Sequence, residues 1–299
     1  MSVFLSGWLD RRPPAVGTSS SMAAYPSLSE RIMTAGSHPL ILSSINDPTA
    51  RHFYEFSRSR GLPISWATFQ DFRRGDLDFK RLELALDASS GIYLRESEES
   101  DDLDCYIGSM VRTFIEPCEN VVRPSGQSTN WCKPYHAFSL ASKVNKISFP
   151  STRLTNDNLL QDGVVIKNCS ALPSYVFSSD EVEFDLSKSS HIRQQKVDGL
   201  EVRVHVVDDE CFSALIVASA LDYRRSGEFD IRECEIDADV SDELQRLSRF
   251  EGLRFAGIDM IFDGCRAYLI EINPMPGYHT FDVARGNPIS MALYSALKK

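Results

Sequence analysis

Residues 255–277 constrain this chain more than any other stretch. They read FAGIDMIFDGCRAYLIEINPMPG, two strongly apolar runs on either side of Asp263-Gly264. Apolar runs separated by an Asp-Gly pair predict a β-hairpin. Each predicted strand also carries an acidic residue, Asp259 in the first and Glu271 in the second. A carboxylate within an apolar strand is costly unless it is paired or binds a metal, so the two acids are candidates for a site.

The distance between the two carboxylates depends on the turn that joins the strands. An odd-length loop centred on Cys265 would pair Asp259 directly with Glu271 on one face, whereas a two-residue Asp-Gly loop would place them on opposite faces. In the first register Asn273 joins the same face. Two carboxylates and an amide oxygen then form a hard oxygen site suited to Mg²⁺ with phosphate. The alternative is a pair of solvated acids at the strand ends.

The hairpin resembles the last strands of the ATP-grasp ligases through the motif IDMIF…YLIEINPMPG. In that family an Asp on one strand and a Glu-x-Asn on the next hold two magnesium ions on ATP. The resemblance therefore implies that Asp259, Glu271 and Asn273 are metal ligands, with ATP and Mg²⁺ as cofactors. It also implies an α/β (α+β) ATP-grasp fold with a small N-terminal α/β domain, a central lid subdomain and a C-terminal catalytic subdomain.

Sequence patterns divide the 299 residues into four expected parts. These are an N-terminal extension at 1–36, an N-terminal α/β domain at 37–120, a central ATP-binding subdomain at 121–196 and a C-terminal catalytic subdomain at 197–299. The extension is rich in Pro, Gly and Ser, and two interpretations fit it: a loose segment, with a first strand near its start, or a lid over substrate. In the α/β domain, Asp47 is expected to cap a helix and 82–86 to form a strand.

Two lysines of the central part are candidates for binding phosphate. Lys133 is expected in the first turn of a helix that Ser128 caps and that runs to about Asn145, where its charge opposes the helix dipole and favours an anionic partner. An exposed surface lysine is the alternative. Lys167 ends the apolar strand VVIK. The resemblance implies that both lysines reach the ATP phosphates. The loop at 168–174 lacks glycine, as is typical of the peptide-modifying branch of the family.

The segment 191–207, HIRQQKVDGLEVRVHVV, predicts two strands joined by an Asp-Gly turn. It resembles the hinge of the ATP-grasp fold. By that resemblance the backbone at Lys196 and Val197 meets adenine. Gln195 would contact the base through its side chain, and Glu201 would face the ribose.

Two arginines are candidates for catalysis. Arg203 matches the family's catalytic arginine, and a planar fork of donors suits a transferring phosphoryl group and a developing oxyanion. From the residues alone, the alternative is a cross-strand pair with Glu201 or Asp208. The sequence at 222–224, Asp-Tyr-Arg, falls where graspetide synthetases carry Asp-Trp-Arg, so Arg224 is expected to grip a γ-phosphate or a substrate carboxylate.

Net charge, cysteine spacing and the length of apolar runs indicate where the protein is located and which partners it can bind. The net charge of −10 argues against general nucleic-acid binding. Seven cysteines without a C-x-x-C spacing are typical of reduced thiols in a cytosolic protein. No apolar run reaches the roughly 20 residues of a membrane span. We therefore expect a cytoplasmic protein without nucleic-acid or membrane partners, for which a homodimer is one option.

The resemblance is strongest over residues 120–299 and is closest to the graspetide synthetases and the ribosomal-protein glutamate ligase-like branch. It implies a ligase in which ATP phosphorylates a carboxylate and an amine or hydroxyl then attacks, giving an amide or ester. Three interpretations of the substrate stay open. The first is a maturase that macrocyclises side chains of a ribosomal precursor peptide in natural-product biosynthesis, favoured by the Asp-Tyr-Arg sequence, the short loop and a C-terminal helix capped by Asn287. The second is an amino-acid or peptide ligase acting on a small molecule or protein tail. The third is a nucleotide-binding subunit without catalysis.

Overall fold

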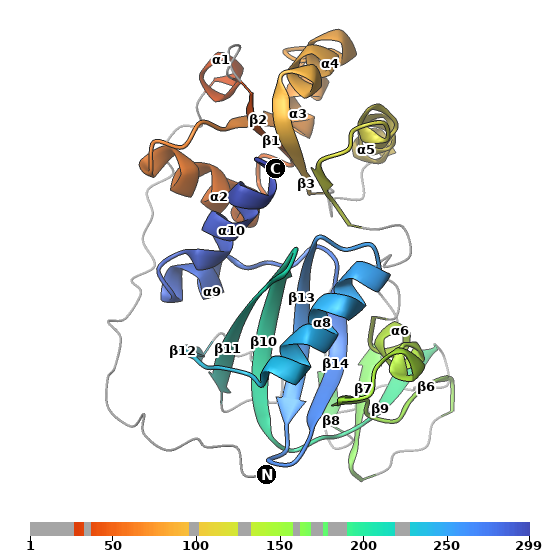
Figure 1. Cartoon of the computed structure of the whole chain (residues 1–299). Helices are drawn as coiled ribbons and strands as arrows, with labels where there is room; N and C mark the ends of the chain where they lie inside the picture. Colours follow the sequence, from red (N-terminus) through yellow and green to blue (C-terminus); the bar gives the residue numbers. More distant parts are fainter. Residues whose placement is uncertain are drawn as a thin grey trace.

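The computed structural model describes residues 27–32, 37–95, 102–124, 133–157, 162–168, 176–178, 190–218 and 228–299. They form three β-sheets with helices packed on them (Figure 1). One sheet belongs to an N-terminal lobe, and the other two lie below it in that view. Among the described helices, none combines the length and the apolar character needed to cross a membrane.

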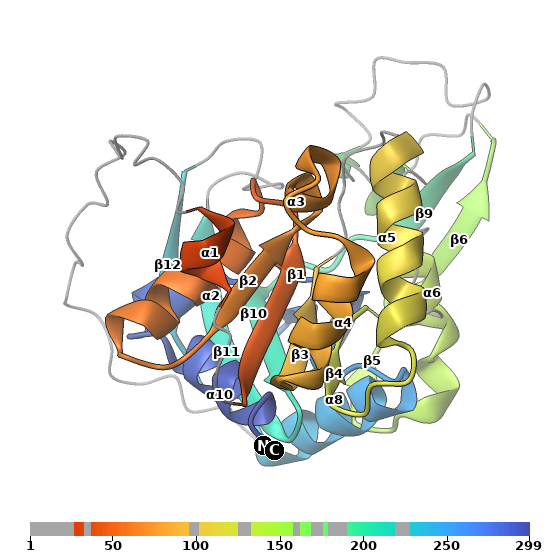
Figure 2. The same ribbon diagram turned by 90° about the horizontal axis from the view of Figure 1, so that it is seen from above.

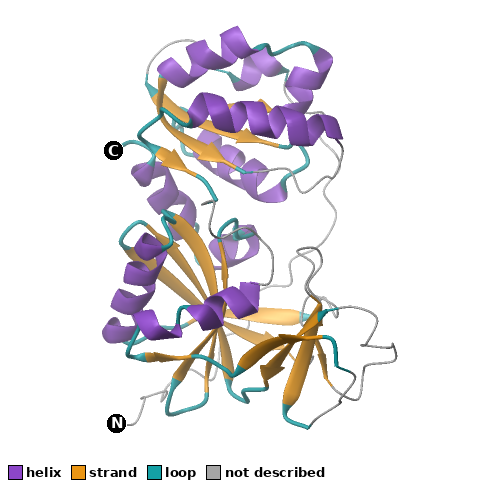
Figure 3. Cartoon of the chain, turned by 90° about the vertical axis from the view of Figure 1, so that its right-hand side faces the viewer, coloured by secondary structure: helices purple, strands orange, loops and turns teal. Residues whose placement is uncertain are grey.

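The N-terminal lobe is a four-stranded parallel sheet in the order β2-β1-β3-β4, surrounded by helices (Figure 3). Side chains alternate between its two faces, because Ile41 packs with α2 whereas its neighbours Leu40 and Leu42 pack with α4 and α5. The elements are α1 (Leu28–Arg31), β1 (His38–Ser43), α2 (Pro48–Ser59), β2 (Ser65–Thr68), α3 (Phe69–Arg74), α4 (Phe79–Asp87), β3 (Ser89–Leu94), α5 (Asp102–Ile115) and β4 (Val121–Val122).

The strand predicted at 82–86 is wrong, because these residues belong to helix α4. The Asp78 side chain accepts a hydrogen bond from the Arg81 amide (2.8 Å) and caps the helix. Leu82 and Leu86 are buried in the lobe's core, whereas Leu84 is 62% exposed. Burial thus follows the helical repeat rather than the alternation of a strand.

The central sheet is small and antiparallel, in the order β6-β9-β7-β8. Its strands are β6 (Thr152–Thr155), β7 (Val164–Asn168), β8 (Val176–Ser178) and β9 (His191–Gln195). Figure 2 shows β6 and β9 extending at one side of the molecule.

The helix expected to reach Asn145 ends earlier. Helix α6 spans Lys133–Ser139 and is followed by a short 3₁₀ helix at Ala141–Lys143. The chain then forms β5 (Ile147–Ser148), which pairs in parallel with the C-terminal sheet rather than with the central one. Through β5, the first part of the expected central subdomain is therefore hydrogen-bonded to the C-terminal sheet.

The C-terminal sheet has six strands in the order β12-β11-β10-β13-β14-β5, with antiparallel pairing among all strands except β5. Its further elements are β10 (Leu200–Val207), β11 (Glu210–Ala218), β12 (Phe229–Glu233), α8 (Ala238–Phe250), β13 (Phe255–Phe262), β14 (Ala267–Asn273), α9 (His279–Ala284) and α10 (Pro288–Ala296). Helix α8 covers one face (Figure 1), where Val204, Ile258 and Leu244 share a core.

The opposite face of this sheet joins the N-terminal lobe. Val207 and Phe255 from the sheet pack in one hydrophobic cluster with Leu293 of α10 and Phe53 of α2. Helices α9 and α10 lie between the two lobes in Figure 1. Burial of apolar side chains from both lobes in one cluster couples the N-terminal lobe to the C-terminal sheet.

Asn287 occupies the N-cap position of the last helix as predicted, but it does not cap the helix through its side chain. Asn287 has a positive φ of 68°, and its side chain makes no capping bond. The Asp282 carboxylate accepts instead from the backbone amides of Ile289 (2.8 Å) and Ser290 (3.3 Å). His52 of α2 also bonds to Asp282 (2.9 Å), so one buried carboxylate both caps α10 and ties it to the N-terminal lobe.

Candidate active site

Charged residues from three neighbouring strands form a row on one face of the C-terminal sheet. Arg203 of β10 lies opposite Asp259 of β13, and Asp259 lies opposite Glu271 of β14. Asn273 follows two residues along β14, opposite Gly257. The predicted direct pairing of Asp259 with Glu271 is confirmed. Since directly opposed residues have Cβ atoms about 5 Å apart, both acids can hold one ligand.

The hairpin reaches this register by a different route from the one expected. The odd-length loop centred on Cys265 is not formed, because the turn closes with a bond from the Asp263 amide to the Arg266 carbonyl (3.2 Å). This even-length turn alone would put the carboxylates on opposite faces. A β-bulge next to Asp259 leaves Ile270 as an extra residue in β14. The added residue restores the common face.

The Arg203 side chain is held from several sides. It is 8% exposed and forms an ion pair with Asp259. Its guanidinium carbon lies 5.9 Å from the centre of the Phe281 ring. A Cβ placed on Gly257 would lie 3.2 Å from that carbon and 2.5 Å from the Cβ of Pro276. The guanidinium therefore passes over a position where only glycine leaves room, and its place is fixed before any ligand binds.

The structure also identifies the cross-strand partner of Arg203. The alternative pairing with Asp208 is wrong, because Asp208 makes two hydrogen bonds of 2.8 Å with Arg254. Glu201 lies two residues before Arg203, on the same face of β10. The guanidinium thus points along the row of acids rather than back towards the β10–β11 turn.

The oxygen atoms of this row fit a magnesium ion. Asp259 and Glu271 supply carboxylates, and the side chain of Asp259 is 21% exposed, so a ligand can reach it. The Asn273 side-chain oxygen accepts from the Met275 amide (3.0 Å), which fixes its orientation. Within the described ranges, no three His, Cys, Asp or Glu side chains cluster as metal ligands. Two carboxylates and one amide oxygen are hard donors, which Mg²⁺ prefers and completes with water and phosphate.

The candidate residues of the central part are placed less completely. Lys167 on β7 is 4% exposed and lies opposite Ile192 of β9. A cation buried to this degree requires compensating groups around it. Lys133 begins α6, but its side chain lies outside the described residues, as does the whole of Arg224.

The expected hinge is anchored through its backbone. The Gln195 amide donates to the Ser151 carbonyl (2.8 Å), and the Gln195 side-chain oxygen accepts from the Ser151 amide (3.4 Å). The Lys196 amide donates to the Gly163 carbonyl (2.8 Å). Because these two amides are engaged, a nucleotide base would use the Lys196 carbonyl and the backbone of Val197.

Sequence reasoning missed the contact that holds the loop after Asn273. Arg95, just after β3, donates to the Asp47 carboxylate (2.7 Å) and to the Pro276 carbonyl (3.0 Å). It also donates to the hydroxyl of Tyr93 (3.1 Å), whose pKa is raised to about 12 mainly by burial. Asp47 caps α2 as predicted, so one carboxylate serves two purposes. The only sequence signal was an arginine at the end of an apolar strand.

A fully buried histidine lies beside the catalytic candidate. His205 follows Arg203 on the same face of β10, and its ring centre is 5.2 Å from that of Phe281. The rings of Phe255 and Tyr278 complete its surroundings, at 6.3 and 6.4 Å. Burial, followed by the charge of Arg203, lowers the pKa of His205 well below its usual value. The neutral ring therefore adds no second positive charge beside the arginine.

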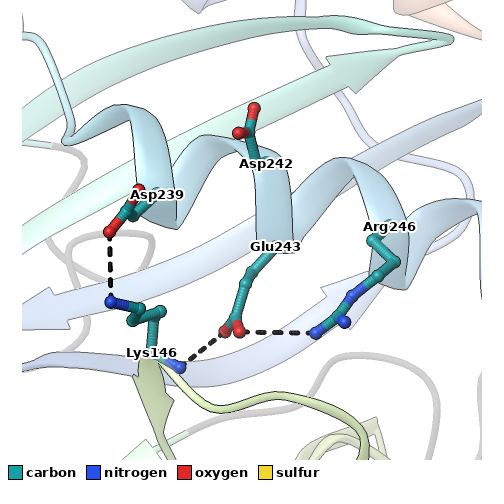
Figure 4. Close-up of a pocket in the computed structure, with 5 residues that line it drawn as sticks. All are labelled: Lys146, Asp239, Asp242, Glu243 and Arg246. Carbon is teal, nitrogen blue, oxygen red and sulfur yellow. Dashed lines mark hydrogen bonds and ion pairs between the residues drawn. The ribbon is translucent and has the colours of Figure 1, made fainter.

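A separate pocket of about 250 Å³ lies on α8 and is lined by Lys146, Asp239, Asp242, Glu243 and Arg246 (Figure 4). Its charges are engaged with one another: Lys146 pairs with Asp239 at 3.2 Å, and Arg246 with Glu243 at 3.3 Å. Glu243 also accepts from the Lys146 amide (2.9 Å). These contacts attach the segment before β5 to α8, and the pocket is distinct from the charged row.

No protein-family model and no curated protein matches the sequence of this chain. Solved structures do match it. PsnB, an ATP-grasp ligase complexed with a minimal precursor, superposes with a TM-score of 0.67 at 21% identity, covering 88% of this chain and 98% of PsnB. Macrocyclase MdnC from Microcystis aeruginosa MRC, bound with precursor peptide MdnA, gives 0.66 at 16% identity, covering 87% and 99%.

A third match is a RiPP-associated ATP-grasp ligase from Chryseobacterium gregarium, in complex with ADP and a leader and core peptide. Its TM-score is 0.66 at 16% identity, and the alignment covers 87% of this chain and 96% of the ligase. All three alignments span nearly the whole of both chains. This chain therefore has the fold of the ATP-grasp ligases, as the hairpin motif predicted.

Proposed function

We propose that this protein is an ATP-dependent ligase that links side chains of a ribosomal precursor peptide into a macrocyclic amide or ester. The observation that carries the proposal is the row of Arg203, Asp259 and Glu271 across three paired strands. It combines a fixed cation with an oxygen site for magnesium, the two elements that phosphoryl transfer requires. The precursor peptides bound to PsnB and MdnC support a peptide as the substrate.

In this proposal, different residues of the chain bind the metal, the phosphates, the base and the ribose of MgATP. Asp259, Glu271 and Asn273 would hold the metal, which would supply positive charge to the transferring phosphate. Lys167 and Lys133 bind phosphate. The remaining nucleotide contacts come from the hinge, where Gln195, Lys196 and Val197 meet the base and Glu201 the ribose.

Arg203 is the residue that stabilises charge during the reaction. A carboxylate oxygen of the peptide attacks the γ-phosphorus, the bond to the β-phosphate oxygen breaks, and ADP leaves with that electron pair. The planar fork of Arg203 donates to the transferring group and then to the acyl phosphate. Because Phe281 and Gly257 fix the guanidinium in advance, little reorganisation is needed in the transition state. Arg224 closes over the γ-phosphate or the substrate carboxylate.

The proposed organisation follows the expected division of the chain. We assign residues 37–120 to the N-terminal domain, whose sheet also includes β4 (Val121–Val122), 121–196 to the central subdomain and 197–299 to the catalytic subdomain, with 1–36 as an extension. Strand β5 lies within residues 121–196 but pairs with β14 of the catalytic sheet. We further propose that the protein acts in the cytoplasm without nucleic acid or membrane, with a homodimer as one option.

The test combines ADP release with mass spectrometry. Synthetic copies of the short peptides encoded beside the gene are incubated with the protein, MgCl₂ and ATP. The proposal expects ADP release that needs both magnesium and a peptide, together with loss of water from that peptide. Gain of an amino-acid mass would instead indicate a peptide ligase. ATP binding without ADP release would contradict catalysis.

A further inference from the structure

The segment after the metal-binding strand brings a histidine to the neighbourhood of Arg203. Pro276 is the nearest neighbour of the position where Gly257 lacks a side chain, and the Arg203 guanidinium passes over the same position. His279 follows three residues later as the first residue of α9, and it is half-buried. Between them, Gly277 is exposed. The ring of Phe281, two residues further along α9, has its centre 5.9 Å from the Arg203 guanidinium carbon, so in sequence His279 lies between two residues that adjoin the proposed reaction centre.

The orientation of the His279 ring follows from its contact with the start of α2. Its Nδ1 atom lies 3.5 Å from the Thr49 hydroxyl at the start of α2. In the tautomer with the proton on Nδ1, the ring donates to this hydroxyl, and the lone pair is on Nε2. Thr49 itself is buried, so it can hold the ring without competing for the same space as a substrate.

Burial and the neighbouring charges favour the neutral form of His279. Burial lowers its pKa, and the neighbouring His52 and Arg95 lower it further, whereas Asp47 opposes them. These groups come from α2, its cap and the end of β3, which are the elements that face the ring. A histidine whose pKa lies below 6.5 is mostly unprotonated at pH 7 and can accept a proton.

The proposed reaction needs such a group. An amine enters as an ammonium and a hydroxyl enters protonated, so each must lose a proton to attack an acyl phosphate. In the described part of the site, Arg203 stays charged, His205 is fully buried, and the two acids hold the metal. His52 is engaged with Asp282. Among these groups, His279 combines partial exposure with a lone pair that the Nδ1-protonated tautomer leaves on Nε2.

We propose that His279 is the general base that activates the incoming nucleophile, an inference that rests on the ligase function proposed above. The proton of the amine or hydroxyl moves to Nε2. The freed electron pair forms the new bond to the acyl carbon, and the bond from that carbon to the phosphate oxygen breaks. Phosphate leaves with those electrons, and His279 then releases its proton to solvent.

The test separates activation of the carboxylate from attack by the nucleophile. The probes are the synthetic peptides encoded beside the gene and hydroxylamine, which is an uncharged nucleophile at neutral pH and traps an acyl phosphate as a hydroxamate. In His279→Gln, hydroxamate formation should stay within about twofold of the parent. Formation of the dehydrated peptide should fall roughly 10²- to 10⁴-fold, the usual range for loss of a general base.

A matched control and two further readouts complete the experiment. His136→Gln removes a half-buried histidine that pairs with Glu251 (2.7 Å) on the far side of the sheet from the row, and both reactions should remain unchanged. In the parent, peptide dehydration should decline as the pH falls below 6.5, whereas hydroxamate formation in His279→Gln should lack that decline. Added imidazole should partly restore dehydration in His279→Ala.

Three results would overturn the inference. Equal losses of hydroxamate and dehydrated peptide would assign His279 a structural role. Unchanged dehydration would exclude it as the base. Absence of ADP release and hydroxamate in the parent protein would reject the ligase function itself, a result distinguishable from failure of the histidine alone.

Discussion

The C-terminal sheet and the central sheet hold their candidate residues in different ways. Strands β10 and β13 each have eight residues and pair along their length, so Arg203 and Asp259 are fixed in register. In the central sheet β8 has three residues and β7 has five, and the hinge offers mainly backbone. This contrast suggests that the first sheet sets the geometry of the reaction and the second sets the affinity for nucleotide.

The largest expected effect is that of Glu271→Gln. The change removes one negative charge from the metal site and keeps the side chain's shape, so the fold should persist while the metal-held transition state is lost. We expect kcat to fall by roughly a hundredfold or more, about 3 kcal/mol of stabilisation. Steady-state ADP release and thermal unfolding measure the two properties. Glu210→Gln, at an exposed position on β11, is the control, and equal activity in both variants would reject the metal assignment.

Arg203→Lys should cause the second-largest loss of kcat. Lysine keeps the charge but cannot reproduce the planar fork. Loss of one such donor typically lowers kcat about 10²- to 10³-fold. ATP affinity should change little, because the role belongs to the transition state. Arg232→Lys, on exposed β12, is the matched control. A kcat near the parent value would move the catalytic role away from Arg203.

Lys167→Met tests the other side of the comparison. Methionine keeps an unbranched side chain in a buried position but removes the charge. The loss of charged hydrogen bonds should weaken ATP binding by about 1.5–3 kcal/mol, roughly ten- to a hundredfold in Kd. Titration calorimetry with ATP measures it, and Lys146→Met on the surface pocket is the control. A fall in kcat with unchanged ATP affinity would contradict the assignment of reaction geometry to the C-terminal sheet and nucleotide affinity to the central sheet.

The smallest expected effect is that of Lys196→Ala. Its side chain makes an exposed pair with Asp198 at 3.1 Å, and such pairs contribute little. Because the hinge is expected to meet adenine through backbone, the Kd for ATP should stay within about twofold. Calorimetry under the same conditions provides the comparison. A tenfold loss would instead assign nucleotide recognition to this side chain.

The elements that the sequence predicted best are those whose two faces differ in chemistry. In β10, Val202, Val204 and Val206 point into the core with α8, while Arg203 and His205 lie on the other face. This alternation predicts a strand and also assigns its faces. The hairpin with its two acids was predictable for the same reason, since its apolar runs leave few other structures open.

The features that could not be predicted depend on contacts between distant residues. The sequence of α4 fits a strand as well as a helix, because Leu82, Leu84 and Leu86 also alternate. The bulge that leaves Ile270 as an extra residue in β14 has no local signal in the sequence. The bond from Arg95 to Pro276 joins positions 181 residues apart in sequence.

That bond has a consequence for redesigning this protein and for the way such chains can diversify. A chimera that borrows the first lobe of a relative, in order to accept another peptide, would also discard the guanidinium of Arg95 that steadies the Pro276 carbonyl. The chimera would then gain selectivity but lose turnover rate, unless the grafted lobe also carried the equivalents of Asp47 and Arg95. Recombination at the lobe boundary is thus constrained by Asp47 and Arg95, which connect the N-terminal lobe to the segment after β14.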